Sequence, residues 1–246
     1  MSEKRLRIFA GPNGSGKTTI ISELKAKFQP DFFGTYVNAD DIESELAKSK
    51  KLNLTSFQIT LSAEQVKAFF QKSTFSPVKT NNADLWKNFS VENNHLIILP
   101  GLILNSYIAA DIAELIRQTL LASDRSFTYE TVMSDVSKLE FIKKAKGKNY
   151  RVYLYYIATE DPDINISRVN FRVSEHGHAV DPEIIRKRFF KSLDNLKQAV
   201  VLTNRAYIFD NSGKASILIA EITEGSDVKV FDPEKTPNWF TKYLAN

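Results

Sequence analysis

Nine residues near the start of the chain, GPNGSGKTT at positions 11–19, have the composition and spacing of a phosphate-binding loop. Glycines allow the backbone to turn tightly, so that several N–H groups point at one polyphosphate. Lys17 is placed to reach the β- and γ-phosphates, and the Thr18 hydroxyl to ligate Mg²⁺. The stretch therefore predicts a nucleotide site made of Gly11, Pro12, Asn13, Gly14, Ser15, Gly16, Lys17, Thr18 and Thr19.

The elements on both sides of this loop support the interpretation. RLRIFA before it is typical of a short buried strand, and TTIISELKAKF after it places Ile20, Ile21, Leu24 and Phe28 on one face of a helix. A phosphate-binding loop requires this order of strand, loop and helix, whose N-terminus adds its dipole to the site. A glycine-rich turn with a chance lysine is the alternative, and the flanking elements disfavour it.

Further apolar segments alternate with helical patterns and predict the fold. Such alternation indicates an α/β protein with a largely parallel sheet. We expect a P-loop NTPase fold with a mainly parallel, five-stranded sheet flanked by helices. The five predicted strands are Arg5–Ala10, Thr35–Ala39, Ser126–Glu130, Val152–Ile157 and Tyr207–Asp210.

Residues 50–101 interrupt this alternation. We expect one P-loop kinase-like domain over residues 1–246, with 50–101 as an inserted subdomain made of a short helix followed by a hairpin. Two interpretations of this segment stay open at equal weight. It either shapes the acceptor side of the site or only lengthens the fold.

Polar residues at strand ends are the candidates for the acceptor chemistry. In an open parallel sheet, catalytic groups gather at the carboxyl ends of the strands. Asp40, with Asp41 as its substitute, follows the second strand and is a candidate general base. Asp40 with Glu43 also resembles a helix cap. The third strand ends in the candidate acceptor-binding residues Glu130, Thr131 and Ser134.

Four arginines follow on two predicted helices, and a Gly-His turn containing His176 and His178 joins these helices. Arginine is always charged and its fork matches phosphate oxygens, so the pair of helices resembles a lid over phosphates. Arg172 and Arg186 are the preferred candidates, ahead of Arg168 and Arg188. Solvated arginines on two amphipathic helices are the alternative.

The composition restricts the classes of protein. The net charge of +4 suits anionic ligands, but no basic stripe interleaved with aromatic residues is visible, which makes nucleic acid an improbable partner. The basic run KKAKGKNYR at 143–151 is typical of a solvated helix end. The absence of cysteine suits the cytoplasm, and no apolar run is long enough for a membrane span.

Taken in order, several motifs resemble the zeta toxin family of P-loop kinases. They are GPNGSGKTT, YVNADDIE, SFTYETVMS, YRVYLYYIATEDPDINISRVNFRVSEHGHAVDPEIIRKRF and AYIFDNS. The resemblance implies phosphorylation of UDP-N-acetylglucosamine with ATP or GTP, and an antitoxin protein as partner. It assigns the base to Asp40, acceptor binding to Glu130 and Thr131, and the lid to Arg172 and Arg186. It also places Asn211 beside the nucleotide base.

The leading hypothesis is therefore a kinase that transfers the γ-phosphoryl of ATP to a hydroxyl of a small molecule. Lys17, Asp40, Arg172 and Arg186 would be its catalytic residues. Two alternatives stay open. One is a polynucleotide or RNA kinase, and the other is an ATP-binding toxin module regulated by a protein antitoxin.

Overall fold

A computed structural model of the chain describes residues 3–174 and 180–245. The chain divides into two compact units. The first comprises Met1–Phe33 and Thr128–Asn246, and the second is the continuous segment Gly34–Phe127.

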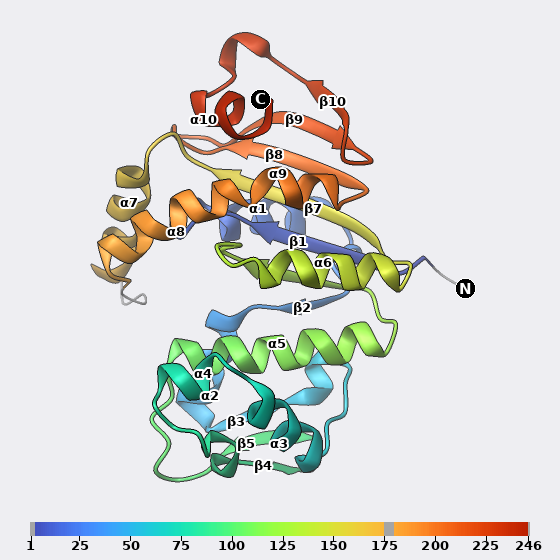
Figure 1. Cartoon of the computed structure of the whole chain (residues 1–246), viewed down its shortest axis with the longest axis vertical. Helices are drawn as coiled ribbons and strands as arrows, with labels where there is room; N and C mark the ends of the chain where they lie inside the picture. The colour runs from blue at the N-terminus through green and yellow to red at the C-terminus, as the bar shows by residue number, and fades with distance from the viewer. Residues whose placement is uncertain (1–2, 175–179, 246) are drawn as a thin grey trace. The chain divides into compact units, whose positions relative to one another are not determined.

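The first unit is an α/β structure (Figure 1). Its strands are β1 (Arg5–Ala10), β6 (Phe127–Thr131), β7 (Arg151–Ala158), β8 (Arg205–Asp210), β9 (Ile217–Thr223) and β10 (Asp227–Val230). Its helices are α1 (Lys17–Lys27), α6 (Ser137–Gly147), α7 (Pro162–Ser174), α8 (Pro182–Asp194), α9 (Leu196–Val201) and α10 (Asn238–Phe240), together with the 3₁₀ helices η1 (Pro30–Phe32) and η4 (Pro233–Lys235) and the π-helix η5 (Thr241–Ala245).

The sheet of this unit has the order β10-β9-β8-β7-β1-β6. β7 pairs in parallel with both β1 and β8, whereas β9 is antiparallel to β8 and β10. The register pairs Ala10 with Tyr156 and Ala158 with Asp210. The carboxyl ends of β1, β7 and β8 therefore meet at one edge of the sheet, and the loops that follow these strands leave from there.

Helices on both faces explain why the central strands are apolar along their length. In Figure 1, α6, α8 and α9 cover the face turned toward the viewer, and α1 lies behind the sheet. Leu6 and Ile8 of β1 and Leu154 and Ile157 of β7 are fully buried. Strands that are buried on both faces have this nearly continuous apolar sequence.

The second unit combines helices with a small antiparallel sheet. Its elements are β2 (Thr35–Val37), α2 (Ala39–Ser49), β3 (Lys51–Asn53), η2 (Leu54–Phe57), α3 (Ala63–Lys72), α4 (Ser76–Lys79), η3 (Leu85–Asn88), β4 (Phe89–Glu92), β5 (His95–Ile98) and α5 (Ser106–Ala122). The sheet order is β3-β5-β4. Asn93 and Asn94 join β4 to β5 with φ angles of 48° and 57°, the left-handed conformation that tight hairpin turns require.

The long helix α5 is held by a buried carboxylate. Asp111 is 5% exposed, and its Oδ2 accepts hydrogen bonds from Ser73 Oγ at 2.6 Å, Ser76 N at 3.0 Å and Ser76 Oγ at 2.6 Å. Since a buried charge without partners is costly, these three donors attach the end of α3, through Ser73, and the start of α4, through Ser76, to α5.

All five predicted strands are present, but the prediction of a five-stranded sheet is wrong in number, because it lacked the antiparallel strands β9 and β10. Thr35–Ala39 is shorter than predicted, since β2 ends at Val37. Segment 50–101 contains the expected helix, α3, and the expected hairpin, β4–β5. That it is an insertion in a single domain stays a prediction, and the compact unit around it is wider.

Two further expectations concern charge and membranes. α6 ends at Gly147, and Lys143, Lys144 and Lys148 are exposed, so the basic run 143–151 is a solvated helix end as expected. Within residues 3–174 and 180–245, no helix is both long and apolar enough to cross a membrane.

Candidate nucleotide-binding site

The predicted phosphate-binding loop joins a buried strand to a helix, as its sequence requires. β1 ends at Ala10, and α1 begins at Lys17. Gly11, Gly14 and Gly16 have φ angles of 142°, 74° and 92°, which side-chain-bearing residues rarely adopt. The predicted order of strand, loop and helix is confirmed.

Close neighbouring atoms are a second reason why only glycine fits at these three positions. A Cβ atom on Gly11 would lie 1.9 Å from the Ile157 carbonyl oxygen of β7. A Cβ on Gly14 would lie 2.5 Å from the Asn165 carbonyl oxygen of α7, and one on Gly16 would lie 2.1 Å from Asn211 Nδ2. The spacing of the glycines therefore follows from three segments that pack against the loop.

Lys17 lies across this loop. Its Nζ donates to the carbonyl oxygens of Gly11 at 2.8 Å and Pro12 at 3.0 Å. Thr18 and Thr19 are exposed in the first turn of α1, which contains no acidic residue. A cationic side chain and an unopposed helix N-terminus favour an anion at this end of α1.

Two side-chain oxygens of the loop also fit a polar ligand. Ser15 Oγ and Asn13 Oδ1 are buried and have no hydrogen-bond partner among the described residues. Buried polar atoms are nearly always paired, so these two indicate a group that is bound in the functional state. The Ser15 hydroxyl can donate to a phosphate oxygen and, with the glycines and Lys17, fits the phosphates of a nucleotide, whereas Asn13 Oδ1 can only accept.

Sequence reasoning missed one residue that contacts the loop. Asn165 of α7 is fully buried, and its Nδ2 donates to the Asn13 carbonyl oxygen at 2.5 Å. Thr159, also buried, donates from Oγ1 to Asn165 Oδ1. The asparagine is one of several polar residues in DINISRVN, and the contact spans 152 positions, so no local pattern identifies it.

Asn211 lies at the loop, although by a contact that the resemblance did not specify. Its Nδ2 donates to the Ser15 carbonyl oxygen at 2.8 Å, and its backbone N–H to Ala158 O at 2.8 Å. Ser212 closes the same turn by donating to Asp210 Oδ1 and accepting from Glu160 N, both at 2.8 Å. A contact between Asn211 and a nucleotide base stays a prediction.

The end of β6 also adjoins the loop. The Gly11 N–H donates to the Thr131 carbonyl oxygen at 3.2 Å, which places the end of β6 beside the loop. Ser134 follows in a turn where Met133 has a φ of 58°. Their role in acceptor binding stays a prediction.

Two residues at the end of α8 donate to backbone carbonyl groups of this turn. Ser192 Oγ donates to Val132 O at 2.6 Å, and Asn195 Nδ2 donates to Met133 O at 2.9 Å. Tyr156 OH lies 3.0 Å from Ser192 Oγ, and burial raises the pKa of Tyr156 far above its ordinary value.

Asp135 follows Ser134 in the same segment. The hydrogen bond from Ser137 to the side chain of Asp135 lowers the pKa of that carboxyl group.

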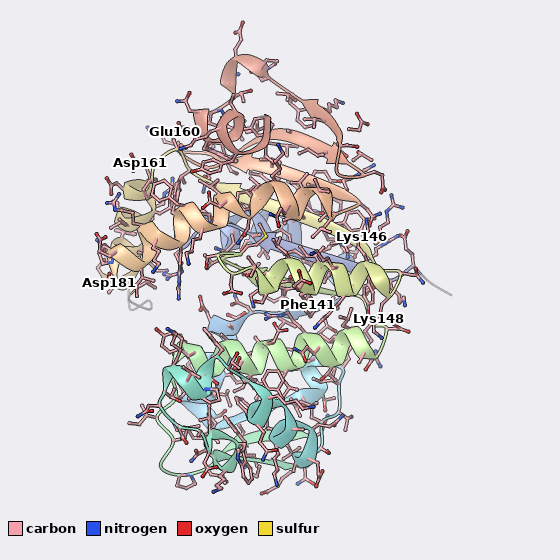
Figure 2. The ribbon with its side chains drawn as sticks, viewed as in Figure 1. Phe141, Lys146, Lys148, Glu160, Asp161 and Asp181 are labelled. Carbon is pink, nitrogen blue, oxygen red and sulfur yellow. The ribbon has the colours of Figure 1, made fainter. Side chains whose placement is uncertain are left out.

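The predicted lid arginines lie on α7 and α8, which begin at Pro162 and Pro182, directly after the acidic residues Asp161 and Asp181 labelled in Figure 2. Arg186 Nη2 donates to Asp163 Oδ1 at 2.5 Å and so joins the two helices. Arg172 is exposed near the end of α7. The predicted turn with His176 and His178 lies outside the described residues. Contacts of Arg172 and Arg186 with phosphate stay predictions.

Asp40 belongs to the second unit and is exposed in the first turn of α2. The predicted cap at Asp40 is wrong, because Asn38 is the N-cap and its Oδ1 accepts from Asp40 N at 2.9 Å. The helix begins earlier than expected because β2 is short. The role of Asp40 as the general base stays a prediction.

Asp41, the substitute for Asp40, lines a cavity of about 290 Å³ in the second unit. Glu45, Tyr36 and Asn38 are also part of its lining. Within the described part of the chain, no cluster of three or more His, Cys, Asp or Glu side chains could hold a metal ion. The role of Thr18 as a ligand to Mg²⁺ stays a prediction.

Comparison with known families supports the resemblance. Residues 106–223 match the family model described as Zeta toxin, a span of just under half of the chain. The resemblance to the zeta toxin family is thus confirmed. A stretch of 63 residues is 32% identical to an uncharacterized protein of Haemophilus influenzae, covering 26% of this chain and 45% of that protein.

Solved structures show the fold over nearly the whole chain. A chain in the crystal structure of AvrRxo1-ORF1:-ORF2 with ATP matches with a TM-score of 0.60 at 15% identity. The native complex of the same proteins gives a TM-score of 0.59, also at 15% identity. Each match covers 94% of this chain and 62% of that chain, so the present chain spans less than two thirds of the AvrRxo1 chain. The α/β fold with a largely parallel sheet is confirmed.

Proposed function

We propose that the chain is a P-loop phosphotransferase of zeta toxin type, which transfers the γ-phosphoryl of ATP to a hydroxyl of a small molecule. The observation that carries the proposal is the loop 11–16. Its glycines have positive φ angles, and the Lys17 ammonium group donates to the carbonyl oxygen of Gly11. The family match over 106–223 supports the reaction class. A fold relative solved with ATP supports the choice of nucleotide, and GTP is its competitor.

The loop and Lys17 would bind the phosphates. Backbone N–H groups of the loop and the N-terminus of α1 provide donors, and Lys17 would exchange the carbonyl oxygens of Gly11 and Pro12 for β- and γ-phosphate oxygens. Thr18 would supply a hydroxyl ligand to Mg²⁺, which neutralises phosphate charge when bound. Arg172 and Arg186 would stabilise the charge that develops during transfer.

The acceptor side is assigned by position. Glu130, Thr131 and Ser134 would orient the acceptor, and Asp40 would take the proton of its hydroxyl. UDP-N-acetylglucosamine is the acceptor that the resemblance implies, and it is the first to test. The need for ATP and the absence of cysteine suit the cytoplasm, where we place the reaction.

The decisive experiment measures ADP release from Mg·ATP with and without UDP-N-acetylglucosamine, and identifies the product by mass. Lys17→Ala should abolish turnover, whereas Lys27→Ala, an exposed lysine in the last turn of the same helix, should leave it unchanged. Asp40→Asn should abolish transfer but retain ATP binding. Normal turnover by Lys17→Ala would refute the proposal.

Two further arms separate the alternatives. Phosphorylation of an oligonucleotide, but of no small molecule, would identify a polynucleotide kinase, whose binding would weaken steeply with salt. The fold relative was crystallised as part of the AvrRxo1-ORF1:-ORF2 complex, which supports an antitoxin-like protein partner for this chain. Inhibition of ADP release by a co-purifying protein would establish such a partner.

A further inference from the structure

Helix α7 presents two polar side chains, one turn apart, that both act on the phosphate-binding loop. Asn165 reaches it directly, because its Nδ2 donates to the Asn13 carbonyl oxygen at 2.5 Å while its Oδ1 accepts from Thr159. Thr159 thus fixes the orientation of the amide, with Nδ2 toward the loop. Residues three apart on a helix lie on the same face, so Arg168 follows Asn165 on this face.

Arg168 reaches the loop through one intermediate. Its Nη1 donates to the Asn211 carbonyl oxygen at 2.7 Å, and its Nη2 to the Gly213 carbonyl oxygen at 3.2 Å. Asn211, held in this way, donates from Nδ2 to the Ser15 carbonyl oxygen at 2.8 Å. In the structure Arg168 thus contacts the turn after β8, and its role in a lid stays a prediction.

The two contacts engage alternate carbonyl groups of the loop, those of Asn13 and Ser15. A loop that binds phosphate needs its N–H groups toward the anion, and a carbonyl oxygen turned the same way would repel it. The hydrogen bonds to the Asn13 and Ser15 carbonyl oxygens exclude the conformation in which these oxygens face the anion, even before a ligand binds. Because the loop is already ordered, less conformational entropy is lost when the ligand binds.

We propose that Asn165 and Arg168 are positioning residues of the phosphate-binding loop, Asn165 directly and Arg168 through Asn211. Nucleotide affinity then depends on α7, although neither side chain needs to touch the nucleotide. The inference rests on the proposed function in one respect only, namely that the ligand of the loop is a nucleotide.

The first test measures the Kd of ATP by calorimetry for wild type, Asn165→Ala, Asn165→Asp and Arg168→Gln. Asn204→Ala is the matched control, since Asn204 Oδ1 accepts from Val152 N at 3.0 Å, at the opposite end of β7 from the loop. We expect the Kd to rise about tenfold for Asn165→Ala, as the loss of one hydrogen bond predicts, and further for Asn165→Asp, whose carboxylate would face the Asn13 oxygen. The Kd of Asn204→Ala should stay within about twofold of the wild-type Kd, even though this variant loses as much unfolding stability as Asn165→Ala does.

The second test needs no nucleotide. Hydrogen exchange of the backbone amides of Gly11 and residues 13–16 should be about five- to tenfold faster in Asn165→Ala than in wild type, and unchanged in Asn204→Ala. Unchanged exchange in Asn165→Ala and Arg168→Gln would overturn the inference, as would a wild-type Kd in both. If wild type binds no nucleotide, the proposed function fails, and the exchange rates still decide whether α7 positions the loop.

Discussion

Replacing Gly11 with alanine should destabilise the first unit more than an ordinary substitution does. The added Cβ would lie 1.9 Å from the Ile157 carbonyl oxygen, which belongs to a central strand and cannot move aside as a flexible side chain would. A φ of 142° costs a residue with a side chain about 1–3 kcal/mol, and overpacking costs about 1–3 kcal/mol more. We therefore expect a loss of about 2–6 kcal/mol from a typical total of about 5–15 kcal/mol.

The assay must report the first unit alone. The chain has two tryptophans, of which Trp239 is buried in this unit and Trp86 belongs to the other. In a Trp86→Phe background, urea unfolding followed by tryptophan fluorescence then measures the unit of interest. Gly147→Ala is the matched control, because a Cβ there meets no atom within 4 Å. Gly147 ends α6, so alanine should be neutral or stabilising by up to ~1 kcal/mol. A loss below about 1 kcal/mol for Gly11→Ala would refute the steric argument.

Three other predictions concern buried and paired side chains. Asp111→Ala should cost about 2–4 kcal/mol, because Ser73 and Ser76 lose a charged acceptor, and a value near zero in urea unfolding would contradict this role. Burial raises the pKa of Tyr155 and Tyr156, so the native state keeps protons that the unfolded state releases, and the free energy of unfolding should fall as the pH rises above about 10. Tyr156→Phe should flatten this decline between pH 9 and 11.5, and an unchanged slope would count against it. Asp163→Asn should change stability by less than ~1 kcal/mol, since the pair with Arg186 is exposed, so a larger loss on thermal unfolding would show a structural role for the pair.

The sequence was informative wherever a local pattern carries the structure. The phosphate-binding loop follows from glycine spacing and from the apolar run before it, and both are local. The strands β9 and β10 also have a local signal in the sequence. ILIAEIT is rich in β-branched residues and is followed by the turn EGSD, which together are typical of a hairpin.

The remaining features depend on contacts between distant segments. Asn165 is buried against the loop only because α7 packs there, and the same residue on an exposed helix face would have no role. The sequence predicts a cap at Asp40 because the end of a short strand is hard to place from its sequence, but the N-cap lies two residues earlier, at Asn38. The distance from Asp40 to any acceptor depends on contacts that no spacing in the sequence encodes.

The division of the chain has a consequence for biosynthesis. The first unit is made of two pieces, and Thr128 Oγ1 donates to Phe33 O at 2.5 Å where the chain leaves the unit and returns. β1 leaves the ribosome early, but its partner β7 follows only after the whole of Gly34–Phe127. The continuous second unit can therefore fold first. The phosphate-binding loop reaches its final conformation only after α7 and the turn after β8 have been synthesised and contact it. A nascent chain that stops before β7 would carry the complete sequence motif without the contacts that Ile157, Asn165 and Asn211 make with the loop.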